Sequence, residues 1–396
     1  MNKILIIKDE LKTGGTTSSF LSLLNVLSKQ TQFKVDVWVA NEKNVVLPEG
    51  ITKIENIALD AAFFQPRGIK KLVYYIKNGL FFLSLYNKFF CKTQKKQIKL
   101  YQQMSIARVK GQVAIDLMDY DAVITWEEFY PCYLLAEKIH TKAKIAWIHP
   151  HYENCGFSKK CDRPFFKKLD AIVAVSEAGK NSLKCCFPEM EEKFYSVENY
   201  LTVEDIRQKS REKQTEIQDD CFNIITVARL QNISKALNRA VNIAARLKNA
   251  DLKFRWYFIG DGPDREEICT LIQKLNIEDN VFLLGEKSNP YKYVKNADLF
   301  VLQSYYEGKP VVVDEAMILG VPVLVTNYDS AAQQVDLRYG FIVDNNEEAI
   351  YQGIQKILKD RKLLDERKDS LKDLDVLSYQ DSRYCLELLD KVVKKC

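Results

Sequence analysis

The chain has 396 residues, of which 47% are hydrophobic and 28% are charged, and its formal net charge is +5 at pH 7. This length is more than one hydrophobic core usually serves, so we expect a globular protein of two domains rather than a disordered chain. No stretch approaches the roughly 20 uninterrupted apolar residues of a membrane span, which argues against an integral membrane protein.

The N-terminal residues and the cysteines indicate the compartment. Residues 1–9 read M-N-K-I-L-I-I-K-D, an apolar run that is too short and too soon charged for a secretion signal. The ten cysteines show no regular spacing, so we interpret them as reduced thiols rather than a disulfide framework. We therefore expect a cytoplasmic protein.

The first half of the chain alternates short apolar runs with helical patterns. We expect buried strands at residues 4–7, 35–39, 122–125, 145–148 and 171–175. Helical patterns occur at residues 20–27, 134–139 and 177–183. This alternation predicts a parallel sheet that is covered on both faces, and such sheets bind ligands beyond the carboxyl ends of their strands.

Residues 61–115 hold eleven lysines and arginines and no acidic residue, so this segment carries the excess positive charge. Within it, apolar residues recur at helical spacing from Ile69 to Leu83, with lysines and aromatic residues close by. A basic, aromatic amphipathic helix is typical of proteins that bind an anionic membrane surface. The alternatives are a core helix with a solvated lysine face and a nucleic-acid groove; the dense aromatic residues favour the membrane over nucleic acid.

The second half repeats the alternation after a charged stretch at residues 204–220, where we place the domain boundary. We expect strands at residues 223–227, 254–259, 281–284, 299–302, 323–326 and 341–343, and helices at residues 236–247, 264–275 and 347–358. The predicted domains are residues 1–205 and residues 206–378. A final helix within residues 379–396 is expected to pack back on the first domain.

Residues 306–322 read Y-E-G-K-P-V-V-V-D-E-A-M-I-L-G-V-P and carry the strongest signal for chemistry. They predict a turn after a buried strand, with Pro310 in the first turn of a helix that stops before Gly320. Free amides at a helix start bind phosphate, and Glu307 and Glu315 would flank them with carboxylates that accept hydrogen bonds from hydroxyls. We therefore expect a ligand with both phosphate and sugar diols; the alternative is a surface glutamate before an ordinary helix.

Two cations are expected at the same edge of the sheet. Arg229 ends the first strand of the second domain, and Lys235 opens the next helix. Two cations that face a leaving diphosphate stabilise its developing negative charge. The alternative is that Arg229 and Lys235 form ordinary surface salt bridges. Gly14 and Gly15 form a similar loop after the first strand of the chain, where a simple tight turn is an equal reading.

Four motifs in order resemble the nucleotide-sugar domain of retaining glycosyltransferases of family 4, such as bacterial capsular and exopolysaccharide enzymes. They are Arg229-Leu230 with Ser234-Lys235, the I-G-D-G-P run at residues 259–263, the V-F-L-L-G run at residues 281–285, and Glu307-Gly308 through Glu315-Ala316. The resemblance covers most of residues 223–345. It implies an α/β protein of GT-B fold, with two Rossmann-like, doubly wound parallel-sheet domains that face a central cleft.

The resemblance also implies roles for individual residues. Glu315 would hold the ribose hydroxyls of the donor, Glu307 would face the donor sugar, and Arg229 with Lys235 would bind its diphosphate. His149, in a strand that ends I-H-P, would reach the donor sugar. The remaining donor-binding positions are Gly14, Gly15, Gly260, Phe282, Glu286, Gly308, Lys309, Pro310 and Val311. The chain departs from the family at Ala236, where glycine is common, and at Lys309-Pro310, which replace an aromatic residue and a glycine.

A metal site is a rival interpretation of the region around His149. His149, His151, Cys155 and Cys161 lie within thirteen residues, and all four are possible zinc ligands. Their spacing matches no common zinc knuckle, so we expect no metal there.

The sequence therefore predicts a metal-independent transferase that moves a sugar from a nucleoside diphosphate sugar, with uridine as the expected base, to a lipid-linked saccharide. Its setting would be surface-polysaccharide synthesis at the inner face of the cell membrane. The alternatives are a GT-B sugar-nucleotide epimerase, an inverting transferase, and a membrane adaptor that has lost turnover. No cofactor beyond the donor and no nucleic acid are expected.

The basic segment generates the first prediction. Replacing Lys70, Lys71 and Lys77 together by Glu should weaken binding to anionic lipid vesicles, because each basic residue near such a surface contributes about 1 kcal/mol. Co-sedimentation with vesicles of phosphatidylserine and phosphatidylcholine measures this, and pure phosphatidylcholine vesicles serve as the control. Unchanged co-sedimentation of the triple variant would contradict a membrane role for this segment.

Overall fold

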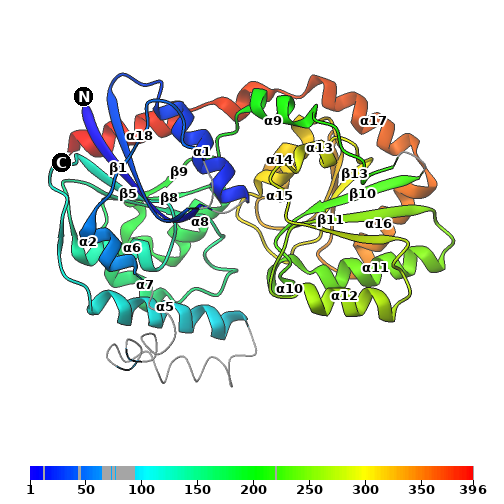
Figure 1. Ribbon diagram of the computed structural model, residues 1–396, viewed down its shortest axis with the longest axis horizontal. Helices are drawn as coiled ribbons and strands as arrows, with labels where there is room; N and C mark the ends of the chain where they lie inside the picture. Colours follow the sequence, from blue (N-terminus) through cyan, green and yellow to red (C-terminus); the bar gives the residue numbers. More distant parts are fainter. Residues whose placement is uncertain are drawn as a thin grey trace. The chain divides into compact units, whose positions relative to one another are not determined.

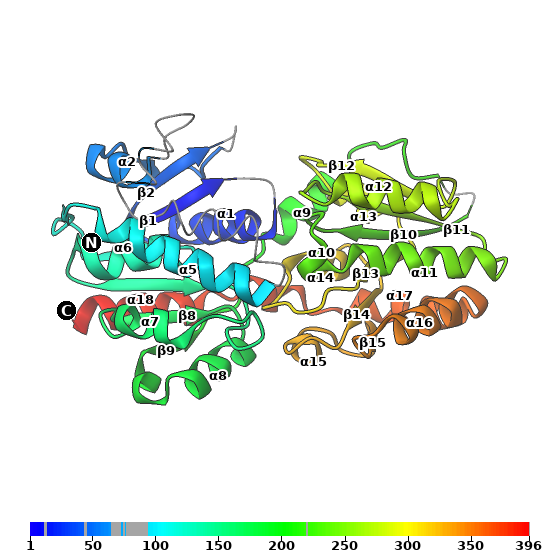
Figure 2. The ribbon, with the colours of Figure 1, turned by 90° about the horizontal axis from the view of Figure 1, so that it is seen from below.

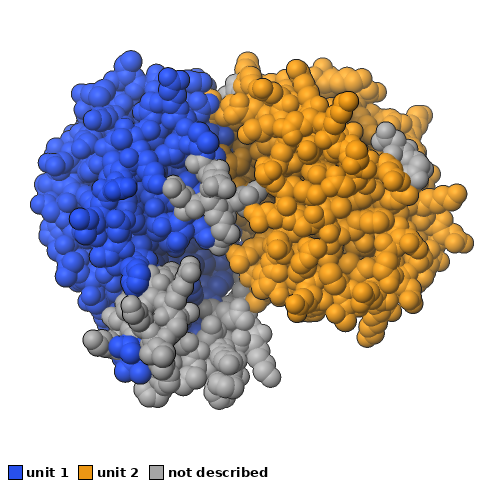
Figure 3. Space-filling view, in the orientation of Figure 1, with its two compact units in different colours: residues 1–12, 20–199, 382–396 blue, residues 13–19, 200–381 orange. Residues whose placement is uncertain are grey.

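The structure is a computed structural model that describes residues 1–11, 14–42, 46–64, 73, 76, 94–218 and 221–395. The chain divides into two compact units, coloured separately in Figure 3. Unit 1 comprises Met1–Lys12, Phe20–Asn199 and Ser382–Cys396, and unit 2 comprises Thr13–Ser19 and Tyr200–Asp381. Most of the amphipathic pattern of residues 69–83 lies outside the described residues, so it stays a prediction.

Unit 1 is built on a parallel sheet of seven strands in the order β3-β2-β1-β5-β7-β8-β9. The strands are β1 (Asn2–Leu11), β2 (Phe33–Glu42), β3 (Thr52–Lys53), β5 (Ala122–Thr125), β7 (Lys144–Ile148), β8 (Ala171–Ala174) and β9 (Phe194–Ser196). A small separate pair joins β4 (Ile115–Asp116) and β6 (Ile139–His140). The five strands expected from apolar runs in this half are all present, whereas the short edge strands β3 and β9 were not expected.

Helices cover both faces of this sheet (Figures 1 and 2). One face packs against α1 (Gly15–Leu27) and α18 (Arg383–Lys395), whose apolar residues join the strands in one core. The other face packs against α2 (Ile57–Phe63), α5 (Gln94–Lys110), α6 (Tyr130–Lys138), α7 (Lys159–Phe166) and α8 (Glu177–Cys186). The 3-10 helix η1 (Pro188–Lys193) follows α8.

Unit 2 has a parallel sheet of six strands in the order β12-β11-β10-β13-β14-β15. The strands are β10 (Phe222–Val227), β11 (Phe254–Ile259), β12 (Val281–Gly285), β13 (Leu299–Leu302), β14 (Val323–Thr326) and β15 (Gly340–Val343). Numbered within the unit, this order is 3-2-1-4-5-6, that of a doubly wound nucleotide-binding fold. The chain reverses direction across the sheet between β10 and β13, and ligands bind such folds at the carboxyl ends of those two strands.

Two helical layers cover the sheet of unit 2. One consists of α9 (Val203–Ser210), α13 (Tyr291–Val294), α14 (Val311–Ile318) and α15 (Ala331–Gln334). The other consists of α11 (Leu237–Asn249), α12 (Arg265–Lys274) and α16 (Glu347–Lys359), with Leu364 of α17 (Lys362–Ser370) against it. Short helices complete the unit: α10 (Asn232–Lys235), η2 (Leu371–Asp373) and η3 (Val376–Gln380). In the described part of the chain, no helix combines the length and apolar character needed to cross a bilayer.

A buried hydrogen-bonded pair links three central strands of unit 2. The indole Nε1 of Trp256 on β11 donates to the Thr226 hydroxyl on β10 at 3.0 Å, and that hydroxyl donates to the Val301 carbonyl on β13 at 2.7 Å. Thr226 and Trp256 are fully buried. Because neither side chain can reach water, loss of the hydroxyl would leave an indole N–H and a carbonyl unpaired.

Replacing Thr226 by Val, which has nearly the same shape, should therefore lower the free energy of unfolding by about 1–3 kcal/mol. Urea unfolding followed by circular dichroism measures the loss. Thr270→Val is the matched control, since Thr270 is exposed on α12 and its hydroxyl bonds only within the helix, to the Glu266 carbonyl. Equal stability of the two variants would contradict a structural role for the Thr226 hydroxyl.

Candidate functional site

The loop between β13 and α14 carries Glu307 at the carboxyl edge of the unit 2 sheet. The helix begins at Val311, and Pro310 is its N-cap, with extended backbone angles of φ −72° and ψ 110°. The sequence predicts Pro310 inside the first helical turn, whereas in the structure it lies one residue before the helix. Proline suits this position because its ring fixes φ near the observed value, and because no helical hydrogen bond requires an amide proton there.

The loop after β10 carries the two predicted cations, and here one expectation was wrong. Lys235 does not open the long helix α11; it ends the four-residue helix α10, and α11 begins at Leu237. Ala236 lies between them in the left-handed region, with φ 51° and ψ 43°. Glycine adopts this conformation without steric cost, so the backbone at Ala236 would suit the glycine that the resemblance leads one to expect at this position.

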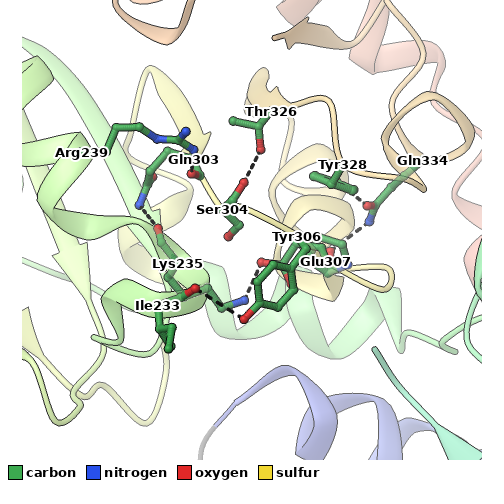
Figure 4. Close-up of polar contacts among 11 residues, drawn as sticks. Ile233, Lys235, Arg239, Gln303, Ser304, Tyr306, Glu307, Thr326, Tyr328 and Gln334 are labelled. Atoms are coloured by element: carbon green, nitrogen blue, oxygen red, sulfur yellow. Dashed lines mark hydrogen bonds and ion pairs between the residues drawn. The ribbon is translucent and has the colours of Figure 1, made fainter. Parts of the chain in front are cut away.

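Lys235 and Glu307 form an ion pair, with Lys235 Nζ 2.5 Å from Glu307 Oε1 (Figure 4). Their side chains are only 24% and 11% exposed, respectively. The pair joins the loops that follow β10 and β13, which are the two strands that flank the reversal of the sheet. A cation and a carboxylate therefore meet where a doubly wound sheet binds its ligand.

Other hydrogen bonds hold the two loops together. Gln303 Nε2 donates to the Lys235 carbonyl at 2.9 Å, and the Tyr305 amide donates to the Ser234 carbonyl at 2.9 Å. The Gln303 carbonyl in turn accepts from the guanidinium of the buried Arg239. The backbone on both sides of the ion pair is thus fixed by protein groups, which keeps the pair at this edge.

Arg229 and Gly260 lie at the neighbouring strand ends. Arg229 is exposed two residues after β10, and no ion pair of its guanidinium occurs among the described residues. Gly260 follows β11 with φ 138°, and a Cβ atom there would lie 2.0 Å from the Ala228 carbonyl oxygen. Its backbone amide donates to the Gly285 carbonyl at 2.9 Å. Gly260 was predicted to bind the donor; the structure adds a packing reason for glycine.

Glu315 is a buried carboxylate on α14, 6% exposed. Its Oε1 accepts hydrogen bonds from the Tyr291 hydroxyl at 3.0 Å and the Ser18 hydroxyl at 3.1 Å. Burial raises the pKa of this carboxyl, and the two hydroxyls oppose the rise. Ser18 belongs to the Thr13–Ser19 segment that groups with unit 2. In the same segment, a Cβ on Gly15 would lie 2.5 Å from a methyl of Val311, so a larger residue there would require the Val311 side chain to move.

His149 lies at the carboxyl edge of the unit 1 sheet, directly after β7. Its Nε2 is 2.7 Å from the Trp126 carbonyl. Burial lowers the pKa of the imidazole from 6.5 to about 4, so the ring is neutral at pH 7. A neutral ring that donates from Nε2 leaves Nδ1 as a hydrogen-bond acceptor.

Acidic residues that the sequence analysis missed lie beside His149. The Lys8 ammonium is almost fully buried and pairs with Glu127 at 2.7 Å, and the other oxygen of Glu127 accepts from the Asp9 amide at 2.8 Å. Burial raises the pKa of Glu128 to about 7, and the His149 amide hydrogen bond opposes the rise. The signal was available as the W-E-E run after the strand at residues 122–125.

The remaining predicted positions are distributed as follows. Phe282 on β12 stacks on Tyr257 with a centroid distance of 5.2 Å, and Glu286 after the strand is exposed. Gly308 and Lys309 are partly buried, and Val311 is buried. Within the described ranges, no group of three or more His, Cys, Asp and Glu residues is placed to hold a metal ion. His149, His151, Cys155 and Cys161 are all described, and they form no such group.

The family model described as "Glycosyl transferases group 1" matches residues 207–372. The match lies within unit 2. Over 212 residues the chain is 33% identical to the N-acetylgalactosamine-N,N'-diacetylbacillosaminyl-diphospho-undecaprenol 4-alpha-N-acetylgalactosaminyltransferase of Campylobacter jejuni, covering 52% of this chain and 56% of that one. It is 30% identical over 178 residues to an uncharacterized glycosyltransferase of Methanocaldococcus jannaschii, covering 43% of each. The chain thus spans about half the length of the curated relatives it matches.

The solved structure of Anabaena HepE in complex with UDP and glucose resembles the whole chain. The TM-score is 0.66 at 14% sequence identity, and the likeness covers 98% of this chain and 100% of that chain. With the two parallel sheets, it confirms the predicted GT-B fold class. The resemblance to family 4 in particular stays a prediction, as does the cleft between the domains.

The neutral His149 gives a prediction that NMR can test. Its ring Cε1–Hε1 signal should stay at the neutral position as the pH falls from 8 to about 5.5, and should move only near the lowered pKa of about 4. The chain has three histidines, and the signal that is lost in His149→Gln identifies the ring. The shift also predicts that stability falls as the pH drops from 6.5 towards 4, because the unfolded chain takes up this proton first. Titration of this signal near pH 6.5 would contradict the lowered pKa of His149.

Proposed function

We propose that this protein is a retaining glycosyltransferase that moves a sugar from a UDP-sugar to a hydroxyl of a lipid-linked saccharide. The observation that carries the proposal is the pairing of Lys235 with Glu307 at the point where the unit 2 sheet reverses. The same loops meet the amino end of α14, where the first helical amides favour an anion. A cation, a carboxylate and a helix start suit a ligand that carries both diphosphate and sugar hydroxyls.

Each residue has a task in this reaction. Lys235 and Arg229 offset the negative charge that grows on the diphosphate as its bond to the anomeric carbon breaks. Glu307 accepts hydrogen bonds from hydroxyls of the sugar, and Glu315 accepts them from the ribose. The acceptor oxygen then bonds to the anomeric carbon on the face that the diphosphate leaves, and its proton passes to a phosphate oxygen. This path retains the anomeric configuration and needs no carboxylate nucleophile.

The comparisons support the uridine base and the lipid-linked acceptor. HepE was solved with UDP and glucose, and TarM of Staphylococcus aureus with UDP. The name of the Campylobacter relative describes N-acetylgalactosamine transfer to a saccharide on diphospho-undecaprenol. By analogy we place this protein in surface-polysaccharide synthesis. Its acceptor would lie in the membrane, which residues 61–115 would contact from the cytoplasmic side through their basic and aromatic side chains.

Assay with a panel of nucleoside diphosphate sugars tests the proposal. Release of UDP with a lipid-linked acceptor supports a transferase, and proton NMR of the product separates retention from inversion. Interconversion of the donor sugar without release would identify an epimerase. No release and no conversion with any donor would favour a silent adaptor.

Replacing Glu307 by Ala should lower kcat by at least about 100-fold, the loss seen when one electrostatic group of an active site is removed. Because Glu307 lies in a loop outside the hydrophobic core and its partner Lys235 keeps contact with water, the unfolding temperature should change little. Glu278→Ala is the matched control, since Glu278 is an exposed glutamate of the same unit. Turnover by Glu307→Ala at the wild-type rate would refute the assignment of this residue.

A further inference from the structure

We propose that Tyr328 and Gln334 are positioning residues that hold the Glu307 loop in the geometry that binds the sugar part of the donor. The proposal rests on the proposed function and extends it to two residues that the resemblance did not single out. Both belong to the segment after β14: Tyr328 lies two residues beyond the strand, and Gln334 ends α15.

A relay of two hydrogen bonds joins this segment to the loop. The Tyr328 hydroxyl donates to Gln334 Oε1 at 2.7 Å, and Gln334 Nε2 donates to the Pro310 carbonyl at 2.9 Å. Figure 4 shows Tyr328 and Gln334 on one side of Glu307, with Lys235 on the other. Tyr328 is 3% exposed and Gln334 is 8% exposed, so the bonds form out of contact with bulk water.

The relay has a fixed direction. A phenol hydroxyl donates its single proton to the amide oxygen of Gln334, so the amide nitrogen must face the Pro310 carbonyl. Burial raises the pKa of Tyr328, and the charges of Glu307 and Asp314 raise it further, so the hydroxyl keeps its proton. Only a side chain with both an acceptor and a donor can replace Gln334 in this relay.

The position of Pro310 matters because it closes the loop that carries Glu307. Its carbonyl also accepts the Val313 amide at 3.1 Å, which is a hydrogen bond of the first turn of α14. The other end of the loop is already fixed by Gln303, whose side chain bonds to the Lys235 carbonyl. Glu307 lies four residues after Gln303 and three residues before Pro310, so release of the Pro310 carbonyl would let the Glu307 carboxylate shift.

A merely structural role makes a different prediction from a positioning role. If the relay only stabilised the fold, its loss would lower stability and weaken binding of UDP and of UDP-sugars alike. If it positions Glu307, its loss should weaken the binding of the sugar while leaving the nucleotide in place. Comparison of UDP with a UDP-sugar separates the two.

The experiment compares Gln334→Leu with Gln333→Leu, because Gln333 is the exposed neighbour on the same short helix. Calorimetric titration with UDP, UDP-N-acetylglucosamine and UDP-N-acetylgalactosamine gives the dissociation constants. We expect Gln334→Leu to bind the preferred UDP-sugar about tenfold more weakly, the effect of one lost buried hydrogen bond, and UDP less than about twofold more weakly. Gln333→Leu should match the wild type in both.

Tyr328→Phe is a second variant that keeps the ring and the packing but frees the Gln334 amide to flip. It should show the same selective loss, by about threefold to tenfold. If the variants bound UDP and the UDP-sugar equally more weakly, or bound both as tightly as the wild type, the positioning role would be overturned and the proposed function would stand. Failure of the wild-type protein to bind UDP or either UDP-sugar would overturn both proposals together.

Discussion

The ion pair between Lys235 and Glu307 is the contact on which the candidate site depends. It exists because β10 and β13, which are far apart in sequence, are neighbours in the sheet of unit 2. That adjacency is the reversal point of a doubly wound sheet, where helices lie on opposite faces to either side and leave the strand ends accessible. The loops after these two strands are therefore adjacent, regardless of which residues they carry. In this chain they carry a cation and a carboxylate, and hydrogen bonds from the Gln303 side chain and the Tyr305 amide keep the loops together.

The exposure of the pair also suits an exchange of partners, in which Lys235 leaves Glu307 for a phosphate group. Both side chains are partly desolvated but neither is sealed in the core, so the attraction is stronger than at an open surface and the cost of burying the two charges is still offset. A diphosphate offers Lys235 more negative charge than one carboxylate does. Transfer of the ammonium to the phosphate would leave the Glu307 oxygens available for sugar hydroxyls. Under the proposed function, this one contact would therefore prepare the site for both the diphosphate and the sugar of the donor.

The sequence predicted the strands well, because buried apolar runs mark them. It predicted helix boundaries and buried polar contacts less well. The strands at residues 254–259, 299–302 and 323–326 have the expected bounds, because continuous apolar runs between turns permit little else in a parallel sheet. Lys235 was placed on the wrong helix, since a residue with positive φ at Ala236 breaks the pattern without a glycine to mark it. Gln334 and Tyr328 were missed because a buried polar pair has no periodic signature. Its partner is a backbone carbonyl of another loop, which only the fold brings near.

The two units share a strand order but differ in how ionisable groups are held at the carboxyl edges of their sheets. Within each large sheet the fourth strand in chain order lies beside the first, as β5 beside β1 and β13 beside β10. The edge of unit 2 carries ionised groups that suit a diphosphate. In unit 1, burial favours the neutral forms of both Glu128 and His149, raising one pKa and lowering the other. Beside these two groups, the buried Lys8 ammonium pairs with the Glu127 carboxylate at 2.7 Å. The same topology therefore holds a partly exposed ion pair at one carboxyl edge, and buried ionisable groups at the other.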